Sequence, residues 1–255
     1  IELLAEADVT KTKAWESGLI EIQDLGSQFI LETLGIVPGS RWLDACAGAG
    51  GKTLQLATLL GPSGHVDATD IRPAALRELE TRATRAGLKN ITILSASPIS
   101  APEISDPREA HKSSTGVPPV GSAVTLPLAS LSQTYDGVLI DAPCTGSGTW
   151  RRSPHLKWTT TPNQVTQAAE TQLSLLTQFA PLVRSGGQLV YATCSLSRLE
   201  NEDVVTAFLA THPDFSAVPA ARPFKATPRS VGLAILPSQH NTDGFYVAAL
   251  RRRRD

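Results

Sequence analysis

The feature that most constrains the fold is a regular alternation of short apolar runs with segments whose apolar residues have helical spacing. Five apolar runs have the character of strands: RWLDAC (41–46), HVDATD (65–70), NITIL (90–94), YDGVLIDAP (135–143) and GGQLVYATCS (186–195). Helical segments follow at 53–61, 73–87, 162–182 and 200–213. Such alternation is typical of a parallel sheet with right-handed crossovers. The sequence therefore predicts an α/β fold, a mostly parallel twisted sheet with helices on both faces.

The ends of the chain extend this pattern. Helical spacing in 25–34 predicts a helix before the first strand. Two strand-like runs, 232–237 and 244–254, follow the last helix with no helix between them. We therefore expect the final strand to pair antiparallel at the end of the sheet. Residues 97–134 are rich in Pro, Ser, Thr, Gly and Ala, which predicts a mobile peripheral insertion.

Composition narrows the class of protein. The formal net charge of −1 means that any nucleic-acid surface must be a local patch. Three cysteines do not suggest a disulfide framework and favour a reducing cytoplasm. No signal peptide and no apolar run of membrane-spanning length is present, so we expect no membrane association. The chain begins at Ile1 and has no methionine, so we expect that residue 1 is not the native start.

A glycine-rich turn follows the first predicted strand, in LDACAGAGGKTLQLA. Gly48, Gly50 and Gly51 permit a tight turn and close approach of a ligand to the backbone. Asp70 ends the second strand about twenty residues later, where a carboxylate can accept hydrogen bonds from ribose hydroxyls. The spacing is not that of a P-loop. This combination predicts a site for a nucleotide-like ligand; the alternative is an ordinary strand–helix turn with a solvated aspartate.

Two of the three cysteines end predicted strands. Cys144 follows Pro143 after the fourth strand, and Cys194 closes the fifth. Because ligands of open α/β sheets bind beyond the carboxyl ends of the strands, we expect both thiols to face one crevice beside Asp70. The alternative is that free cysteines are small core residues. We favour that alternative for Cys46 only.

Three segments resemble the signature motifs of the Sun/Nop family of RNA (cytosine-5) methyltransferases, of the bacterial rRNA type. They are LDACAGAGGKT, DAPCTGSGTWRRSPHLKW and YATCSLSRLENEDVV. GLIEIQDLGSQ and DGFYVAAL also resemble family segments, and the likeness covers most of the chain outside 97–134. The resemblance implies a Rossmann-like methyltransferase fold. It also implies one catalytic domain over 1–255, with residues 1–35 as its N-terminal segment.

The resemblance implies S-adenosylmethionine as cofactor and carbon 5 of a cytosine in RNA as target. It assigns the nucleophile to Cys194, resolution of the covalent adduct to Cys144 and contact with the target base to Asp141. The cofactor contacts that it implies are Ala47, Gly48, Gly50, Gly51, Lys52, Asp70 and Asp141. A thiolate that adds to carbon 6 makes carbon 5 nucleophilic, which divides one difficult step into two easier ones.

The sequence departs from the family pattern in the cofactor region. Ala49 stands in the turn where proline is common in the family. Many members carry an acid after the third strand, and here Ser97 or a neighbour takes that place. Many members also have a helical RNA-binding domain at the N-terminus, for which we find no counterpart in this sequence.

Basic and aromatic residues follow Cys144. We expect Arg151, Arg152 and Lys157 to contact RNA phosphates, and Trp150 or Trp158 to stack on bases. The alternative is a solvated loop with packed tryptophans. The expected partner is RNA, ribosomal RNA before others, with no metal and no membrane, and the protein is expected to be a monomer in the cytoplasm.

Other functions remain open from the sequence. A methyltransferase for a small molecule or a protein explains the glycines and Asp70 but not the two thiols. A DNA methyltransferase places the nucleophile on Cys144, and a tRNA methyltransferase differs only in the RNA. An S-adenosylmethionine-binding RNA scaffold without turnover is the alternative outside the enzymes.

Overall fold

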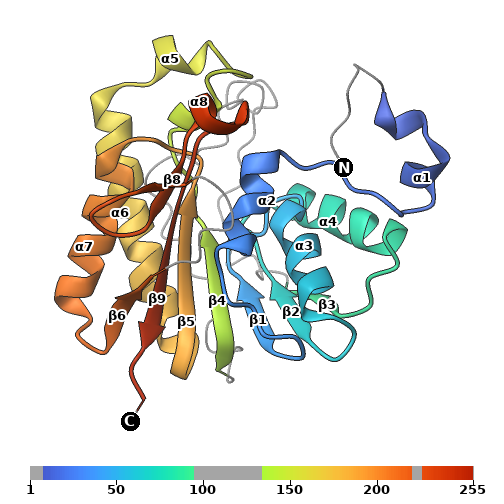
Figure 1. Ribbon diagram of the computed structural model, residues 1–255, viewed down its shortest axis with the longest axis horizontal. Coiled ribbons are helices and arrows are strands. Elements are labelled where there is room, and N and C mark those ends of the chain that lie inside the picture. The colour runs from blue at the N-terminus through green and yellow to red at the C-terminus, as the bar shows by residue number, and fades with distance from the viewer. Residues whose placement is uncertain (1–7, 95–133, 220–225, 255) are drawn as a thin grey trace, which may run out of the picture.

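The computed structural model describes residues 8–94, 134–219 and 226–254. Within these ranges the strands form one sheet in the order β3-β2-β1-β4-β5-β9-β8-β7, and β6 also pairs with β9 (Figure 1). The strands are β1 Arg41–Asp44, β2 His65–Ala68, β3 Ile91–Ile93, β4 Tyr135–Asp141, β5 Val183–Thr193, β6 Phe215–Val218, β7 Thr227–Pro228, β8 Leu233–Ile235 and β9 Phe245–Arg252.

The longer helices flank the strands: α2 precedes β1, α3, α4 and α6 lie between successive parallel strands, and α7 follows β5. They are α2 Leu25–Glu32, α3 Gly51–Leu60, α4 Pro73–Arg85, α6 Pro162–Phe179 and α7 Glu202–Thr211. Short helical turns are α1 Lys13–Glu16, α5 Leu156–Thr159 and α8 Pro237–His240, with 3-10 turns at Val9–Lys11, Ser147–Thr149, Ala180–Leu182 and Arg198–Glu200. Proline begins α4 and α6, where its missing N–H has no helical partner to lose.

The strand order confirms the predicted topology. β3, β2, β1, β4 and β5 are parallel, and β9 pairs antiparallel with both β5 and β8. The strands β1, β4 and β5 therefore end at the same edge of the sheet. Their last residues are Asp44, Asp141 and Thr193. Loops that carry polar groups leave the sheet at this edge.

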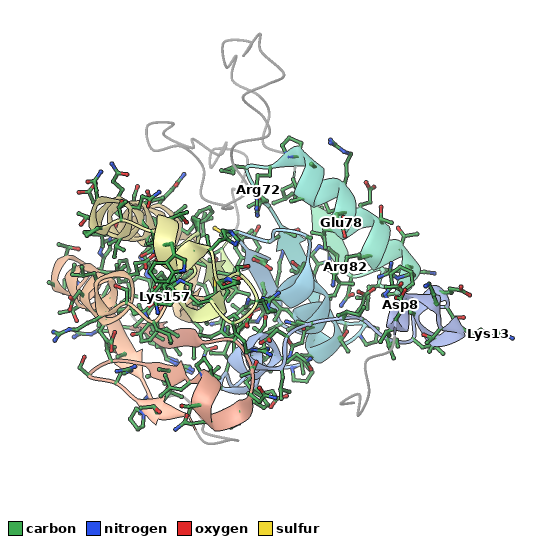
Figure 2. All side chains as sticks on the ribbon, turned by 90° about the horizontal axis from the view of Figure 1, so that it is seen from above. Asp8, Lys13, Arg72, Glu78, Arg82 and Lys157 are labelled. Atoms are coloured by element: carbon green, nitrogen blue, oxygen red, sulfur yellow. The ribbon has the colours of Figure 1, made fainter. Side chains whose placement is uncertain are left out.

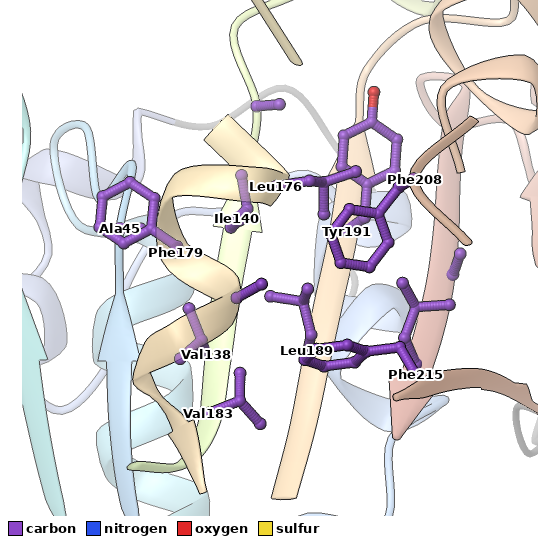
Figure 3. Packing of buried hydrophobic residues seen from close by; sticks show 14 of the residues in the cluster. Ala45, Val138, Ile140, Leu176, Phe179, Val183, Leu189, Tyr191, Phe208 and Phe215 are labelled. Atoms are coloured by element: carbon purple, nitrogen blue, oxygen red, sulfur yellow. The ribbon is translucent and has the colours of Figure 1, made fainter. Parts of the chain in front are cut away.

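Successive apolar residues of a strand point to opposite faces of the sheet, and helices cover both faces. Val138 and Ile140 of β4 pack under α6, whereas Leu139 between them faces α2 and α3. Figure 3 shows Leu176 of α6 against the first of these faces, with Tyr191 of β5 beside it. Because both faces are covered, a shift of one residue in register would exchange the two sets of buried side chains.

The structure corrects several boundaries. The first two strands end at Asp44 and Ala68, so Cys46 and Asp70 lie in loops beyond the sheet. Strand β6 and helix α5 were not predicted from the sequence. The predicted insertion at 97–134 lies outside the described residues except for residue 134. No helix in the described ranges is long and apolar enough to span a membrane.

The N-terminal segment packs on α4. Glu21 bonds to the guanidinium groups of Arg82 and Arg85, and Arg85 lies 3.8 Å from the centre of the Trp15 ring. Figure 2 shows Arg82 on the side of α4 toward this segment. These contacts hold residues 22–24 at the edge of the sheet where the loops gather.

Candidate active site

A cavity of about 620 Å³ opens beyond the carboxyl ends of the parallel strands. Its walls come from the turn after β1, the loop after β2, the segments after β4 and β5, and residues 22–24 of the N-terminal segment. A volume of this size is typical of a pocket for a small-molecule ligand. The cavity brings together residues that are far apart in sequence.

The glycine turn forms one wall. Gly48 and Gly50 have φ angles of +56° and +90°, a backbone conformation that favours glycine. A Cβ at Gly50 would also lie 2.3 Å from Leu79 Cδ1, so the fully buried Leu79 side chain would have to shift. Helix α3 begins at Gly51, and no side chain caps its first N–H groups. The turn thus presents backbone donors to the cavity.

Asp70 lies beside this turn. Its carboxylate accepts hydrogen bonds from Gly48 N at 2.8 Å, from Arg72 N and Nε at 2.9 Å each, and from Arg72 Nη2 at 3.0 Å. Burial alone would raise the pKa of Asp70, but the bonds from Arg72 outweigh it and the pKa lies below its ordinary value. A ribose would therefore share Asp70 with Arg72, which Figure 2 shows at the start of α4.

Lys52 and Asp141 form an ion pair at the base of the cavity. Lys52 Nζ lies 2.7 Å from Asp141 Oδ2, and the lysine side chain is only 8% exposed. Burial disfavours the ammonium, but the charge and hydrogen bond of Asp141 outweigh it and raise the pKa of Lys52. Lys52 therefore carries its charge inside the site.

The two predicted thiols meet. Cys144 Sγ and Cys194 Sγ lie 3.2 Å apart, with Cys144 buried and Cys194 partly exposed. The hydrogen bond from Cys144 lowers the pKa of Cys194, and the Lys52 charge acts in the same direction against burial. The bond to Cys194, together with burial, raises the pKa of Cys144 well above its ordinary value. The thiolate thus belongs on Cys194 and the proton on Cys144.

Backbone bonds fix the loops that carry these thiols. Gly148 N donates to Cys194 O at 2.9 Å, and Gly244 N donates to Gly148 O at 2.8 Å. A Cβ at Gly148 would lie 2.1 Å from Gly244 O, so only glycine permits this approach. The segments after β4 and β5 and the one before β9 are thereby joined.

The basic residues after Cys144 divide into two kinds. Arg151 and Arg152 both face Asp243, whose side chain is fully buried; Arg152 Nε bonds to it at 2.6 Å and Arg151 Nη2 lies 3.8 Å away. Lys157 lies 5.3 Å from the ring centre of Trp158, which is 81% exposed, and Figure 2 shows this lysine on α5. Trp150 instead has a buried indole nitrogen.

The structure places most predicted site residues around the cavity. Those that line it are Ala47, Gly48, Gly51, Lys52, Asp70, Asp141, Cys144, Arg152 and Cys194. Gly50, Arg151 and Lys157 do not line it, and Ser97 lies outside the described residues. Cys46 packs on the core as expected but also reaches the cavity wall. The sequence did not indicate Arg72 or Glu200 as site residues. Arg72 is two residues from Asp70 but its side-chain orientation has no sequence pattern, and Glu200 bonds to Thr145, 55 positions away.

The fold and site together define a class. A mostly parallel sheet with an antiparallel last strand, a glycine turn after β1 and an acid after β2 is the architecture of a Rossmann-like methyltransferase. Within this class, residues 31–251 match the family described as 16S rRNA methyltransferase RsmB/F. The chain belongs to this family, which confirms the resemblance seen in its motifs.

Named relatives agree with this assignment. The chain is 34% identical to the probable ribosomal RNA small subunit methyltransferase B of Bacillus subtilis, over 98% of this chain and 52% of the relative. It is also 34% identical to methyltransferase B of Thermus thermophilus, over 93% of this chain and 53% of the relative. A solved structure, NSun6 from Pyrococcus horikoshii with SFG, superposes with a TM-score of 0.77 at 27% identity, covering 98% of this chain and 57% of that one. The chain spans about half the length of the curated relatives that it matches.

Proposed function

We propose that this chain transfers a methyl group from S-adenosylmethionine to carbon 5 of a cytosine in RNA through a covalent cysteine adduct. The observation that carries the proposal is the 3.2 Å separation of Cys144 Sγ and Cys194 Sγ at the edge of the cavity. A methyltransferase for a small molecule or a protein has no use for two thiols in contact. The names of the relatives support an RNA target.

The residues present fit S-adenosylmethionine. The backbone of Gly48 and Gly51 leaves room for close approach, and the Asp70 carboxylate suits ribose hydroxyls. The similar structure of NSun6 was solved with SFG, an analogue of this cofactor, which supports S-adenosylmethionine as the cofactor here. When bound, S-adenosylmethionine supplies an electrophilic methyl group.

Cys194 is the nucleophile in this proposal. Its thiolate, stabilised by Cys144 and Lys52, adds to carbon 6 of the cytosine and loads electron density on carbon 5. Bond formation removes the negative charge of Cys194, whose hydrogen bond contributes most to the high pKa of Cys144. Cys144 then passes its proton more readily to solvent in the cavity that it lines, and its thiolate accepts the proton that leaves carbon 5 before Cys194 departs.

Asp141 and Lys52 orient the base. Asp141 is partly exposed, with an oxygen free for the polar edge of a cytosine once Lys52 Nζ occupies the other. Lys52 is held by this pair and by the Phe245 ring, whose centre lies 5.5 Å from Nζ. Both side chains therefore enter the reaction already positioned.

Cys194 is the more exposed of the two thiols and its pKa is lowered, which supports an RNA rather than a DNA methyltransferase, because the DNA type uses the cysteine of the Pro-Cys motif, here the buried Cys144. A cofactor-binding scaffold without turnover gives no reason for a lowered pKa at Cys194. Ribosomal RNA is proposed before tRNA because both curated relatives named above are ribosomal RNA methyltransferases.

We further propose residues 1–255 as one catalytic domain, acting as a monomer, since one chain supplies all the site residues described above. A cytoplasmic location suits two thiols in contact that must stay reduced. Light scattering of the purified chain tests the oligomeric state.

The test of function is methyl transfer. The chain is incubated with S-adenosylmethionine carrying a labelled methyl group and with unmethylated ribosomal RNA, tRNA, DNA or protein in parallel. We expect label in ribosomal RNA, and 5-methylcytidine after nuclease digestion and mass spectrometry. Label confined to DNA or protein, or label in RNA on another atom, would refute the proposal.

A further inference from the structure

Glu200 is a buried carboxylate that the reaction described above does not use. Its side chain has no exposed area, and it lies in the 3-10 turn Arg198–Glu200 between β5 and α7. An ionised carboxylate in such a place is costly unless every oxygen is hydrogen-bonded. What surrounds Glu200 therefore indicates why it is there.

The Glu200 carboxylate bridges the two cysteine loops through Oε2, and its Oε1 accepts from Thr145 N and Gln172 Nε2. Thr145, next to Cys144, donates its backbone N–H at 2.8 Å and its hydroxyl at 2.6 Å. Ser195, next to Cys194, donates its hydroxyl at 2.6 Å. Gln172 Nε2, from the middle of α6, lies 3.3 Å away and also donates to Pro143 O at 2.9 Å. One side chain thus ties the residue that follows each thiol to the other loop and to α6.

The hydrogen bonds around Ser195 point toward the same charge. Leu196 N donates to Ser147 Oγ at 2.8 Å, and Ser147 Oγ lies 3.1 Å from Ser195 Oγ. Because the Ser195 hydroxyl donates to Glu200, its neighbour Ser147 donates to Ser195 in turn. The Glu200 charge therefore aligns a chain of donors that spans both loops.

The same charge acts on the thiols. The titratable groups that interact with Cys144 are Cys194, Glu200 and Tyr191, whose hydroxyl donates to Glu200 O. The interaction with Cys194 and burial are the larger causes of the high pKa of Cys144, and the negative charge of Glu200 raises this pKa further. It therefore helps to keep the proton on Cys144.

We propose that Glu200 is a positioning residue, which holds the loops of Cys144 and Cys194 at the separation that the reaction needs. It touches neither thiol in a hydrogen bond and acts through Thr145 and Ser195. The catalytic consequence rests on the proposed function, whereas the effect on thiol geometry does not.

Two substitutions separate the effect of the Glu200 hydrogen bonds on loop position from the effect of its negative charge. Glu200→Ala removes all the acceptors and leaves Thr145 N without a partner. Glu200→Gln keeps the shape: its oxygen can accept from Thr145 N and Gln172, and its amide can donate to the Thr145 and Ser195 hydroxyls, which rotate to accept. Glu202→Gln is the matched control, since Glu202 is also buried but faces Arg229 at 3.6 Å.

The first experiment measures thiol geometry without any substrate. Diamide takes two electrons and two protons from Cys144 and Cys194, forms one S–S bond and is reduced to the hydrazine. The rate of formation of this bond is followed by mass spectrometry of proteolytic peptides. We expect Glu200→Ala to slow it by about tenfold or more, because the effective concentration of one thiol at the other falls. Glu200→Gln and Glu202→Gln should stay close to the wild type.

The second experiment measures methyl transfer and thiol titration. Glu200→Ala should lower kcat by about 100-fold with the KM for S-adenosylmethionine unchanged, since Glu200 does not line the cavity. Glu200→Gln should restore most of kcat, and alkylation of Cys144 should occur at lower pH in it than in the wild type, which a purely structural role would not produce. A wild type without methyl transfer refutes the proposed function but leaves the diamide result standing.

The inference is overturned if Glu200→Ala forms the Cys144–Cys194 bond at the wild-type rate, or if it keeps the wild-type kcat. Should Glu200→Ala fail to fold, Ser195→Ala and Thr145→Val each remove one hydroxyl donor from the bridge. Each variant is then expected to slow disulfide formation by a smaller factor. If both variants form the disulfide at the wild-type rate, the inference is also overturned.

Discussion

Lys52 Nζ lies 2.7 Å from Asp141 Oδ2, although 89 positions separate the two residues in the sequence. The pairing of β1 with β4 brings them together, because Lys52 is in the first turn of the helix after β1 and Asp141 ends β4. The ammonium is therefore fixed beside both the Asp141 carboxylate, which we propose contacts the base, and the Cys194 thiol.

Lys52→Met tests this relationship. Loss of the ammonium removes one of the groups that lower the pKa of Cys194, so alkylation of Cys194 should require a higher pH. Methyl transfer should fall by about tenfold or more, because less thiolate is present and Asp141 loses its partner. The measurements are the pH profile of iodoacetamide labelling and the rate of methyl transfer.

Lys13→Met is the control, since Lys13 is exposed on α1 and Figure 2 shows it at the margin of the molecule. If Lys52→Met labels at Cys194 with the wild-type pH profile, the ammonium does not influence the thiol.

Asp70→Ala tests the cofactor site. The carboxylate offers charge-assisted bonds to a ribose, so its loss should weaken S-adenosylmethionine binding by more than about tenfold in calorimetry. Asp136→Ala is a suitable comparison, because Asp136 lies near the opposite end of β4 and pairs with Arg184. Equal affinity in the two variants would remove Asp70 from the site.

Asp44 makes stability depend on pH. Burial raises the pKa of Asp44 to about 7, although the Thr53 hydroxyl donates to it. A carboxyl with a raised pKa in the folded state is stabilising while protonated, and that stability is lost as pH rises from about 4 to about 7. The free energy of unfolding should therefore fall over this range by up to about 4 kcal/mol from this group.

Urea unfolding of the wild type and of Asp44→Asn at a series of pH values isolates the contribution, because the asparagine does not titrate. As pH rises across this range, the free energy of unfolding of the wild type should fall relative to that of Asp44→Asn. A constant difference would show that Asp44 keeps an ordinary pKa.

The sequence predicts the parts of this structure that depend on local pattern. Period-two apolar runs and glycine turns locate the parallel strands, and the rule for their carboxyl ends brings Cys144, Cys194 and Asp70 to one cavity. The contact of the two thiols follows from the pairing of β4 with β5.

Contacts between distant loops were not predictable. Two of the four bonds to Asp70 depend on the orientation of the Arg72 side chain. The bridge at Glu200 joins Thr145, Gln172 and Ser195 from three separate segments. Strand β6 is short and half exposed, so its pairing with β9 depends on tertiary packing rather than on its own pattern.

The RNA surface can be tested at separate positions. Arg151→Ala and Lys157→Ala should each weaken RNA binding and reduce the slope of log affinity against log salt by about one. Arg152→Ala should in addition lower Tm, because it removes the closer partner of the fully buried Asp243. Arg77→Ala, on the exposed side of α4, serves as the control in filter binding over a salt series. Wild-type slopes in both Arg151→Ala and Lys157→Ala would place the RNA elsewhere.

In the proposed reaction the two thiols have different roles, so their variants should fail differently. Cys194→Ala removes the nucleophile, and neither a covalent RNA adduct nor methyl transfer should be detectable. Cys144→Ala leaves a nucleophile but removes the thiol that takes the proton from carbon 5, so an adduct should accumulate on denaturing gels. The raised pKa of Cys144 beside Cys194 is the physical basis of this asymmetry, since ionisation of one thiol disfavours ionisation of the other. A DNA-type mechanism gives the reverse result, with the adduct present in Cys194→Ala; normal turnover in both variants would exclude covalent catalysis by either thiol.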